Sequence, residues 1–122
     1  MKKILKPYLL KSKRYFDKRG FFQELFLKKN FKTKSIFTAI AFSKKNVIRG
    51  MHFQQKNKQT KIITVLSGKI LDVSVNLKKK SKDFGKVFYF NMSEGESVYI
   101  PNHYAHGYEC LSKNALILYH LD

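Results

Sequence analysis

One stretch of the chain, residues 70–77, alternates strictly between apolar and polar side chains. Its two faces are Leu71, Val73, Val75 and Leu77 on the apolar side and Asp72, Ser74 and Asn76 on the polar side. Successive side chains of a β-strand point to opposite faces, so this pattern is typical of a strand with one face in a core. It predicts that the apolar face is buried and that the polar face meets solvent.

Short apolar runs rich in aromatic and β-branched residues recur along the rest of the chain. They predict a short strand within residues 1–16, a buried strand at 35–42, and strands at 60–66, 86–90, 98–101, 108–111 and 115–121. Turns are predicted at 17–20, 67–68 and 94–96, and loops at 28–34, 78–85 and 102–107. Residues 21–26 fit a strand or a short helix equally well. Strands at this spacing indicate an all-β antiparallel sandwich or barrel, with one domain over residues 1–122.

The formal net charge of +17 suggests anionic partners such as nucleic acid or phosphorylated metabolites. Lysine supplies nearly all of that charge, because Arg14, Arg19 and Arg49 are the only arginines in the sequence. A protein that reads nucleic acid usually carries arginines for bidentate contacts, together with aromatic stacking motifs. We therefore expect a solvated lysine-rich surface and no nucleic-acid partner.

Cysteine usage and the N-terminal residues indicate in which cellular compartment the protein is expected. Cys110 is the only cysteine, so no disulfide forms within the chain and a reducing environment is expected. The start of the chain imitates a signal peptide, but Lys6 and Pro7 interrupt its apolar region and no small-residue cleavage site follows. No apolar run reaches membrane-spanning length. We expect a soluble, cytoplasmic protein that does not bind membranes.

The most specific stretch is residues 46–54, Asn-Val-Ile-Arg-Gly-Met-His-Phe-Gln. Its β-branched pair favours a strand, and Gly50 relieves the backbone. His52 follows between the apolar side chains of Met51 and Phe53. We expect His52 to be half-buried, with a pKa that its surroundings can move across neutrality.

Several kinds of chemistry can be weighed for these residues. His103 and His106, with His52, could hold a metal ion, but their number and spacing fall short of a usual ligand set, and we expect no metal. Phosphate-binding glycine loops and the Gly-x-Ser-x-Gly nucleophile motif are absent from the sequence. Acid–base chemistry remains: a histidine can remove a proton next to a carbonyl, a cation can stabilise the enolate, and a tyrosine can return a proton.

Six segments, in order, resemble the dTDP-4-dehydrorhamnose 3,5-epimerase family, which belongs to the cupins. These segments are Asp17–Glu24 (Asp-Lys-Arg-Gly-Phe-Phe-Gln-Glu), residues 46–54, Gln59–Lys61, Gly68–Leu77, Ser81–Gly85 and Ile100–Gly107 (Ile-Pro-Asn-His-Tyr-Ala-His-Gly). The resemblance implies a cupin-type double-stranded antiparallel β jelly roll, usually a homodimer. It also implies epimerisation at C3 and C5 of a dTDP-linked 4-keto-6-deoxy sugar, without metal or organic cofactor, in cell-surface polysaccharide biosynthesis.

The resemblance also implies roles for individual residues. His52 falls on the position of the general base and Tyr119 on that of the general acid across the sugar ring. Lys61 falls where a cation can stabilise the enolate. The substrate-contacting positions are matched by Arg19, Glu24, Arg49 and His106, and Asp72 would line the cleft.

The chain departs from the family pattern in ways that keep other functions open. Family members usually continue past the position of Asp122 and carry there a carboxylate that partners the base, so we expect a C-terminally short member, with activity reduced or lost. Asp72 or a residue of a second copy could replace that carboxylate. Residues 37–39 replace polar sugar contacts of the family. The alternatives are a non-catalytic nucleotide-sugar-binding or assembly cupin, and a 3,4-ketoisomerase. The latter carries a second histidine where this chain has Gln54.

Overall fold

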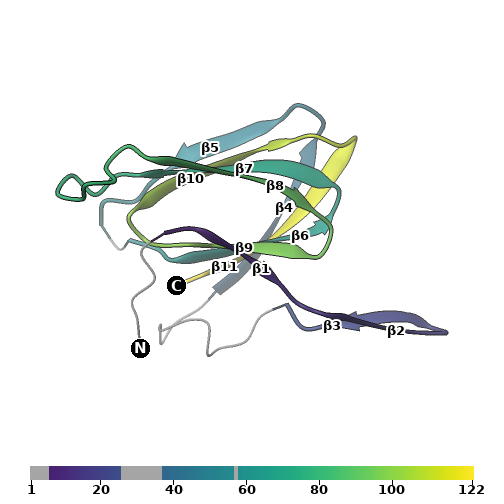
Figure 1. Cartoon of the computed structure of the whole chain (residues 1–122). Helices are drawn as coiled ribbons and strands as arrows, with labels where there is room; N and C mark the ends of the chain where they lie inside the picture. Colours follow the sequence, from purple (N-terminus) through teal and green to yellow (C-terminus); the bar gives the residue numbers. More distant parts are fainter. Residues whose placement is uncertain (1–5, 26–36, 57) are drawn as a thin grey trace.

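The computed structural model describes residues 6–25, 37–56 and 58–122, and every helix or strand in these ranges is a β-strand (Figure 1). The strands are β1 (Tyr8–Lys11), β2 (Arg14–Asp17), β3 (Gly20–Gln23), β4 (Phe37–Lys44), β5 (Ile48–His52), β6 (Lys61–Ser67), β7 (Lys69–Asn76), β8 (Val87–Ser93), β9 (Glu96–Ile100), β10 (Tyr104–Cys110) and β11 (Asn114–Leu121). Within the described residues, no helix is long and apolar enough to cross a membrane.

Two antiparallel sheets face each other across the core. One has five strands in the order β1-β9-β6-β11-β4, and the other has four in the order β5-β10-β7-β8. Between them lie side chains from both sheets, among them Ile63, Val65, Ile70, Met92, Val98, Ile100, Tyr108 and Ile117. Sheets packed in this way bury the alternate side chains of each strand. The arrangement confirms the predicted all-β jelly roll.

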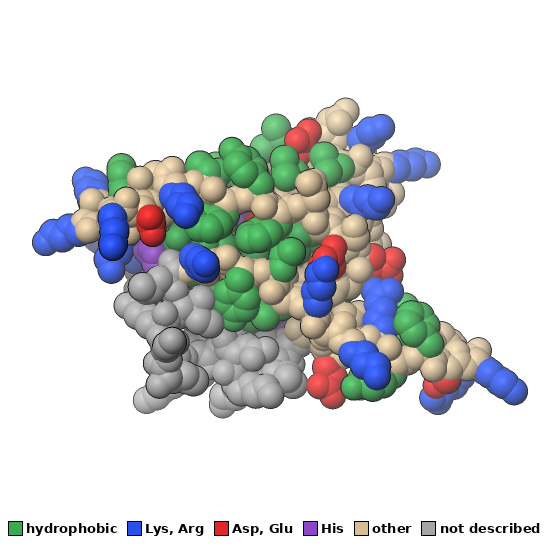
Figure 2. All heavy atoms as spheres, viewed as in Figure 1, with side chains coloured by type: hydrophobic (Ala, Val, Ile, Leu, Met, Phe, Trp, Pro, Cys, Tyr) green, Lys and Arg blue, Asp and Glu red, His purple; other side chains and the backbone are tan. Residues whose placement is uncertain are grey.

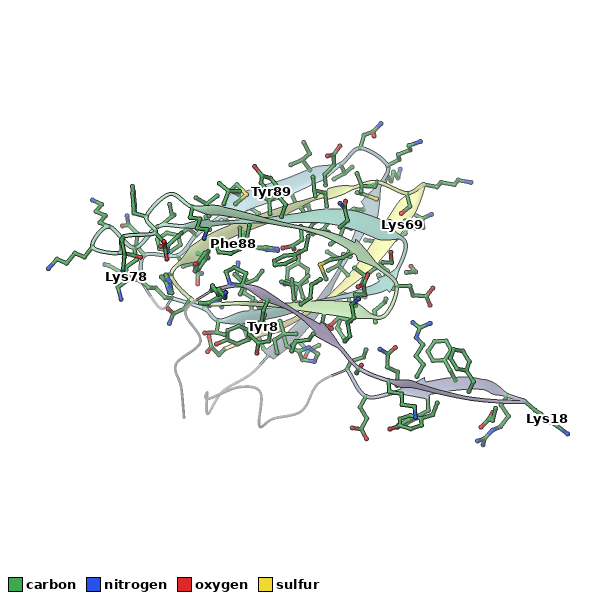
Figure 3. All side chains as sticks on the ribbon, in the orientation of Figure 1. Tyr8, Lys18, Lys69, Lys78, Phe88 and Tyr89 are labelled. Atoms are coloured by element: carbon green, nitrogen blue, oxygen red, sulfur yellow. The ribbon has the colours of Figure 1, made fainter. Side chains whose placement is uncertain are left out.

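The strands β2 and β3 form a separate hairpin that projects from the body of the molecule (Figure 1). Lys18 lies at its far end (Figure 3). The hairpin decides the ambiguous run 21–26 in favour of a strand, because Phe21 pairs with Phe16 and Phe22 with Tyr15. Phe26 lies outside the described residues. All four aromatic side chains of the hairpin are exposed.

The prediction for the alternating strand β7 assigned its buried and exposed faces the wrong way round. The polar side chains of Asp72, Ser74 and Asn76 are buried between the sheets, whereas Leu71 and Val73 on the opposite face are only partly covered. In the neighbouring β8, Phe88 packs against the core and Tyr89 is exposed (Figure 3). Periodicity identifies the two faces of a strand, but it does not identify which face a second sheet covers.

Two further predictions need correction. The run at 35–42 was expected to be a buried strand, yet β4 is the edge of the five-stranded sheet and Phe37, Ile40 and Phe42 are exposed. Residues 35 and 36 lie outside the described residues, as does the loop predicted at 28–34. Residues 102–107 were expected to form a loop, but β10 already begins at Tyr104.

Lysine and arginine side chains are dispersed rather than gathered on the face shown in Figure 2. They stand at separate places along its outline, while hydrophobic side chains occupy much of the middle. Part of the charge lies on the loop between β7 and β8, where Lys78, Lys79, Lys80 and Lys82 follow one another closely.

Candidate active site

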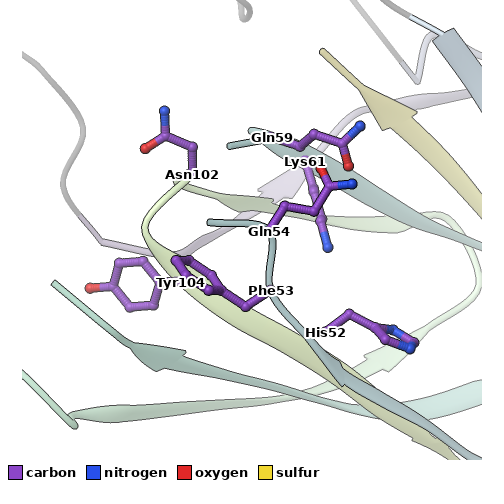
Figure 4. Close-up of a pocket in the computed structure, with 7 residues that line it drawn as sticks. All are labelled: His52, Phe53, Gln54, Gln59, Lys61, Asn102 and Tyr104. Carbon is purple, nitrogen blue, oxygen red and sulfur yellow. The ribbon is translucent and has the colours of Figure 1, made fainter. Parts of the chain in front are cut away.

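Two adjoining hollows near the ends of β5 and β6 share His52 and Lys61 in their walls. The first, of about 280 Å³, is lined by His52, Phe53, Gln54, Gln59, Lys61, Asn102 and Tyr104 (Figure 4). The second, of about 250 Å³, lies between the two sheets and is lined by Ala39, Ile40, Ala41, Arg49, His52, Lys61, His106, Gly107, Tyr108, Tyr119 and Leu121. We call the second hollow the cavity. It brings together five of the predicted site residues from four strands.

Close approach of β5 and β10 places His52 beside His106. The two histidines are register partners in neighbouring strands. Gly50 adopts φ +93°, and a Cβ atom there would lie 2.6 Å from the carbonyl oxygen of His106. A Cβ atom on Gly107 would lie equally close, 2.6 Å, to the carbonyl oxygen of Arg49. Both glycines are therefore needed for this strand pairing.

His52 itself is exposed rather than half-buried, which corrects the sequence expectation. Its side chain stands at the end of β5, where the strand leads into residues 53–60 (Figure 4). Among the described residues, it forms no hydrogen bond with a neighbouring side chain. An exposed imidazole exchanges its protons readily with water.

A buried acid–histidine pair lies at the cavity wall. The Asp72 carboxylate oxygen Oδ2 and His106 Nε2 are 2.5 Å apart, and the two side chains are 0% and 3% exposed. The other carboxylate oxygen, Oδ1, has no hydrogen-bond partner among the described residues. The bond between Oδ2 and Nε2 offsets part of the cost of burying the two groups. Asp72 is thus bonded to His106, not to the exposed His52 that the sequence hypothesis paired with it.

Lys61 provides a cation next to this pair. It is the first residue of β6, its burial lowers the pKa of its ammonium group, and the nearby Asp72 carboxylate opposes that shift. A lysine in this position loses part of its hydration, which strengthens its interaction with any anion in the cavity.

Tyr119 reaches the cavity from the facing sheet, on β11. Its burial raises the pKa of the hydroxyl far above the ordinary value, so the group keeps its proton at neutral pH. Tyr108, on β10, lines the cavity beside it. A phenol held in its protonated form can act as a proton donor.

A polar chain behind Tyr119 was missed by the sequence reasoning. Tyr108 is bonded to Ser43 at 2.9 Å, and Arg49 donates from Nε to Ser43 at 2.8 Å. A second Arg49 nitrogen donates to the carbonyl oxygen of Phe42 at 2.8 Å. Tyr108 directly follows the segment that resembles the family, and its burial could not be inferred from its neighbours in sequence.

Three of the predicted substrate-binding residues do not line the cavity. Asp72, expected to line it, is fully buried behind His106, and the other two are Arg19 and Glu24. Arg19 lies in the turn of the β2–β3 hairpin, where it bonds the Asp17 carboxylate at 2.6 Å. Glu24 directly follows β3 and is exposed. Their places on the projecting hairpin keep them apart from the other six predicted site residues.

The described residues contain no group of three or more His, Cys, Asp and Glu side chains arranged to hold a metal ion. The cavity instead combines one exposed histidine, one buried acid–histidine pair, one partly buried lysine and one protonated tyrosine. These groups can move protons and stabilise negative charge at neutral pH.

The fold and the cavity define a cupin-type β jelly roll with acid–base side chains between its sheets. The model of the dTDP-4-dehydrorhamnose 3,5-epimerase family matches residues 2–122, and the chain belongs to this family. The dTDP-4-dehydrorhamnose 3,5-epimerase of Salmonella typhimurium is 36% identical over 121 residues, which cover 91% of this chain and 66% of that enzyme. The enzyme of Methanothermobacter thermautotrophicus is 32% identical, over 86% of this chain and 60% of its own length.

Solved structures agree with this assignment. The 3,5-epimerase of Legionella pneumophila in complex with dTDP-4-keto-L-rhamnose superposes with a TM-score of 0.90 at 31% identity, covering 94% of this chain and 65% of that one. The enzyme of Bacillus anthracis, with TDP and pyrophosphate bound, gives a TM-score of 0.87 at 34% identity, covering 95% and 71%. The chain spans about two thirds or less of the length of the first two relatives described above.

Proposed function

We propose that this chain epimerises a nucleotide-linked 4-keto-6-deoxy sugar at C3, C5 or both. The observation that carries the proposal is that His52 and Tyr119, which come from different sheets, line the same cavity together with Lys61. A base and an acid that approach a sugar ring from two sides can invert a carbon atom, because the proton leaves one face and returns to the other.

The residues divide the work as follows. His52 removes the proton next to the C4 carbonyl, and the electron pair moves onto the carbonyl oxygen as an enolate. Lys61 stabilises that oxygen, since a partly desolvated cation interacts strongly with an anion. Tyr119, whose burial keeps it protonated, donates a proton to the carbon from the opposite side. The buried His106–Asp72 pair holds the cavity wall against the substrate.

We further propose a dTDP-linked substrate. This proposal is supported by the solved relatives, one of which is in complex with dTDP-4-keto-L-rhamnose and another with TDP and pyrophosphate bound. In this chain Arg49 lines the cavity, and its two bonds to Ser43 and Phe42 leave guanidinium N–H groups for a phosphate. No organic cofactor or metal is included in the proposal.

A homodimer is the assembly that we propose. The β2–β3 hairpin exposes Tyr15, Phe16, Phe21 and Phe22, and exposed aromatic side chains in such a group are typical of a contact surface. A second copy that receives the hairpin would also bring Arg19 and Glu24 to its surface. Sedimentation equilibrium of the wild type and of Phe16→Ser/Phe22→Ser tests this proposal, which requires a dimer that the double substitution converts to a monomer.

Deuterium exchange tests the proposed chemistry. The chain is incubated in D₂O with a dTDP-4-keto-6-deoxyhexose, and proton NMR follows label and configuration at C3 and C5. His52→Ala should remove both label and inversion, since general base catalysis contributes about 10²- to 10⁴-fold. Tyr119→Phe should retain label and lose inversion, and Tyr99→Phe, a matched change on β9, should alter neither.

Two outcomes would contradict the epimerase proposal. Absence of label with the wild type, under conditions in which a full-length epimerase exchanges, would leave a nucleotide-sugar-binding protein, which titration with dTDP would then detect. Entry of label at C4, together with a carbonyl that has moved to C3, would indicate a ketoisomerase.

A further inference from the structure

Two lysine-rich segments border the first hollow. One is the connection from β5 to β6, residues 53–60, and the other is the loop from β7 to β8, residues 77–86. We call their lysines the basic rim, which consists of Lys56, Lys58, Lys78, Lys79, Lys80, Lys82 and Lys86. All of them are exposed, and within the ranges that the structure describes none forms an ion pair. Their charges are therefore open to an anion in solution.

The connection from β5 to β6 forms part of the wall of this hollow. Phe53, Gln54 and Gln59 of the connection line it (Figure 4). The Lys58 ammonium nitrogen lies 6.0 Å from the centre of the Phe53 ring. Lys61, the first residue of β6, follows directly and lines both hollows. In the sequence, this part of the rim therefore leads directly to the cation in the wall.

The loop from β7 to β8 is held against the segment that contributes Tyr104 to the hollow. At the start of the loop, the Leu77 amide donates to the carbonyl oxygen of His103 at 3.0 Å. At its end, Lys86 Nζ lies 5.2 Å from the centre of the Phe88 ring, and that ring lies 5.9 Å from the ring of Tyr104. Both ends of the lysine-rich loop are thus close to the lining of the hollow.

A charge on this loop acts on the wall of the hollow. Burial raises the pKa of Tyr104, a bond from Asn76 opposes that rise, and the Asp83 carboxylate adds to it. Asp83 is the one acidic residue of the loop sequence. Asp83 and Asp122, which accepts a hydrogen bond from the Thr60 amide, offset only part of the charge of the rim. The potential next to the hollow is therefore positive.

The rim contains lysines only, whereas the cavity holds an arginine. A guanidinium group binds a phosphate in a fixed two-pronged geometry, and Arg49 is held for this by Ser43 and Phe42. A lysine ammonium group is a hydrated point charge on a flexible stem. Such charges suit attraction over a distance better than a fixed contact, so the rim and Arg49 serve different stages of binding.

We propose that the basic rim captures the diphosphate of the substrate from solution and raises the rate at which it reaches the two hollows. The proposal rests on the proposed function, which supplies a nucleoside diphosphate sugar as the ligand. Clefts bordered by charges of one sign raise association rates by about 10- to 10³-fold. Because the Debye length is about 10 Å at 0.1 M salt, the charges nearest the opening contribute most.

Stopped-flow fluorescence tests the capture with dTDP that carries an anthraniloyl group on the ribose. The rim variant is Lys78→Gln/Lys79→Gln/Lys80→Gln/Lys82→Gln. At low salt it should associate about tenfold more slowly than the wild type. Its dissociation rate should stay within about twofold, because rim charges act mainly on association. Added salt should reduce the difference, because ions screen the rim.

A matched variant removes the same number of charges from the opposite end of the sheets. This control is Lys44→Gln/Lys45→Gln/Lys69→Gln/Lys113→Gln. Its lysines are exposed and lie in neighbouring turns, since the Lys45 amide donates to the carbonyl oxygen of Lys113. Lys69 and Lys78 stand at opposite ends of β7 (Figure 3). The two variants have equal net charge, so the control should associate within about twofold of the wild type.

Three results would overturn the capture proposal. Equal slowing in the two variants would show that only net charge matters, and wild-type association in the rim variant would show that the rim has no effect. Asp83→Asn removes the opposing charge and should speed association, so slower association would also contradict it.

The outcomes separate this proposal from the proposed function. A chain that binds dTDP with rim-dependent rates but exchanges no label would contradict the epimerisation and leave the capture intact. A chain that exchanges label while its association with dTDP is independent of the rim would overturn the capture alone.

Discussion

The molecule contains two acid–base pairs of nearly equal length in opposite surroundings. In the cavity wall, Asp72 and His106 are 2.5 Å apart and almost fully buried. In the hairpin turn, Asp17 and Arg19 are 2.6 Å apart, yet their side chains are 48% and 90% exposed. Distance alone would rank the pairs together, but desolvation makes only the first one costly to break. Burial, not contact length, therefore marks the residues on which the site depends.

The largest expected effect comes from breaking the buried pair. Asp72→Ala leaves His106 buried without its partner and should lower the free energy of unfolding by about 3–5 kcal/mol. Urea unfolding followed by tyrosine fluorescence measures the change. A loss no greater than that of the surface control Asp83→Ala would show that the pair is not what stabilises this wall.

The next largest effect is expected when Gly50, in the cavity wall, and Gly20, in the β2–β3 hairpin, are each replaced by alanine. Gly50→Ala brings a Cβ within 2.6 Å of the His106 carbonyl at φ +93°, and should cost about 1–3 kcal/mol in unfolding free energy. Gly20→Ala in the hairpin also has positive φ, +132°, but no atom lies within 4 Å of the added carbon. Its cost should be smaller, because only backbone strain is involved. Equal urea midpoints for the two variants would contradict the steric account.

A smaller effect is expected on the pKa of Lys61. The Asp72 carboxylate opposes the lowering of the Lys61 pKa by burial, so Asp72→Asn should lower that pKa further. A lysine whose pKa falls on folding makes stability rise with pH between the folded and unfolded pKa values, because the unfolded state binds more protons there. NMR titration of the Lys61 side chain measures the shift. An unchanged pKa would show that the carboxylate charge is felt by His106 alone.

The smallest effect belongs to the hairpin pair. Arg19 holds the pKa of Asp17 below its usual range, and any stability from this bond would be present above the unfolded pKa and lost as pH falls through the folded one. Solvent screens both groups, so Arg19→Ala should leave the urea midpoint unchanged between pH 3 and pH 7, a window of ~4 units around the usual carboxyl pKa. A pH-dependent loss of stability would indicate that the hairpin is covered in solution.

Much of the architecture followed from local patterns. Apolar runs bounded by turns predicted most of the strands, including β6, β7 and β11, because a chain of this length must cover its extended segments with one another. The resemblance to the family named six residues that the structure places in or beside the cavity, among them His52, Lys61 and Tyr119.

The burial of individual residues and their contacts depended instead on which strands and sheets pack against each other. The alternation of β7 is visible in the sequence, but the burial of Asp72 follows from the second sheet that covers its polar face. The exposure of β4 follows from its place at a sheet edge. The polar chain of Arg49, Ser43 and Tyr108 joins positions up to 65 residues apart, Ser43 to Tyr108, through strands of two sheets. The sequence by itself determined the strands and the chemical groups. Only the tertiary structure decided which groups lose water and which partners they gain, because desolvation and hydrogen-bond direction arise where distant strands pack.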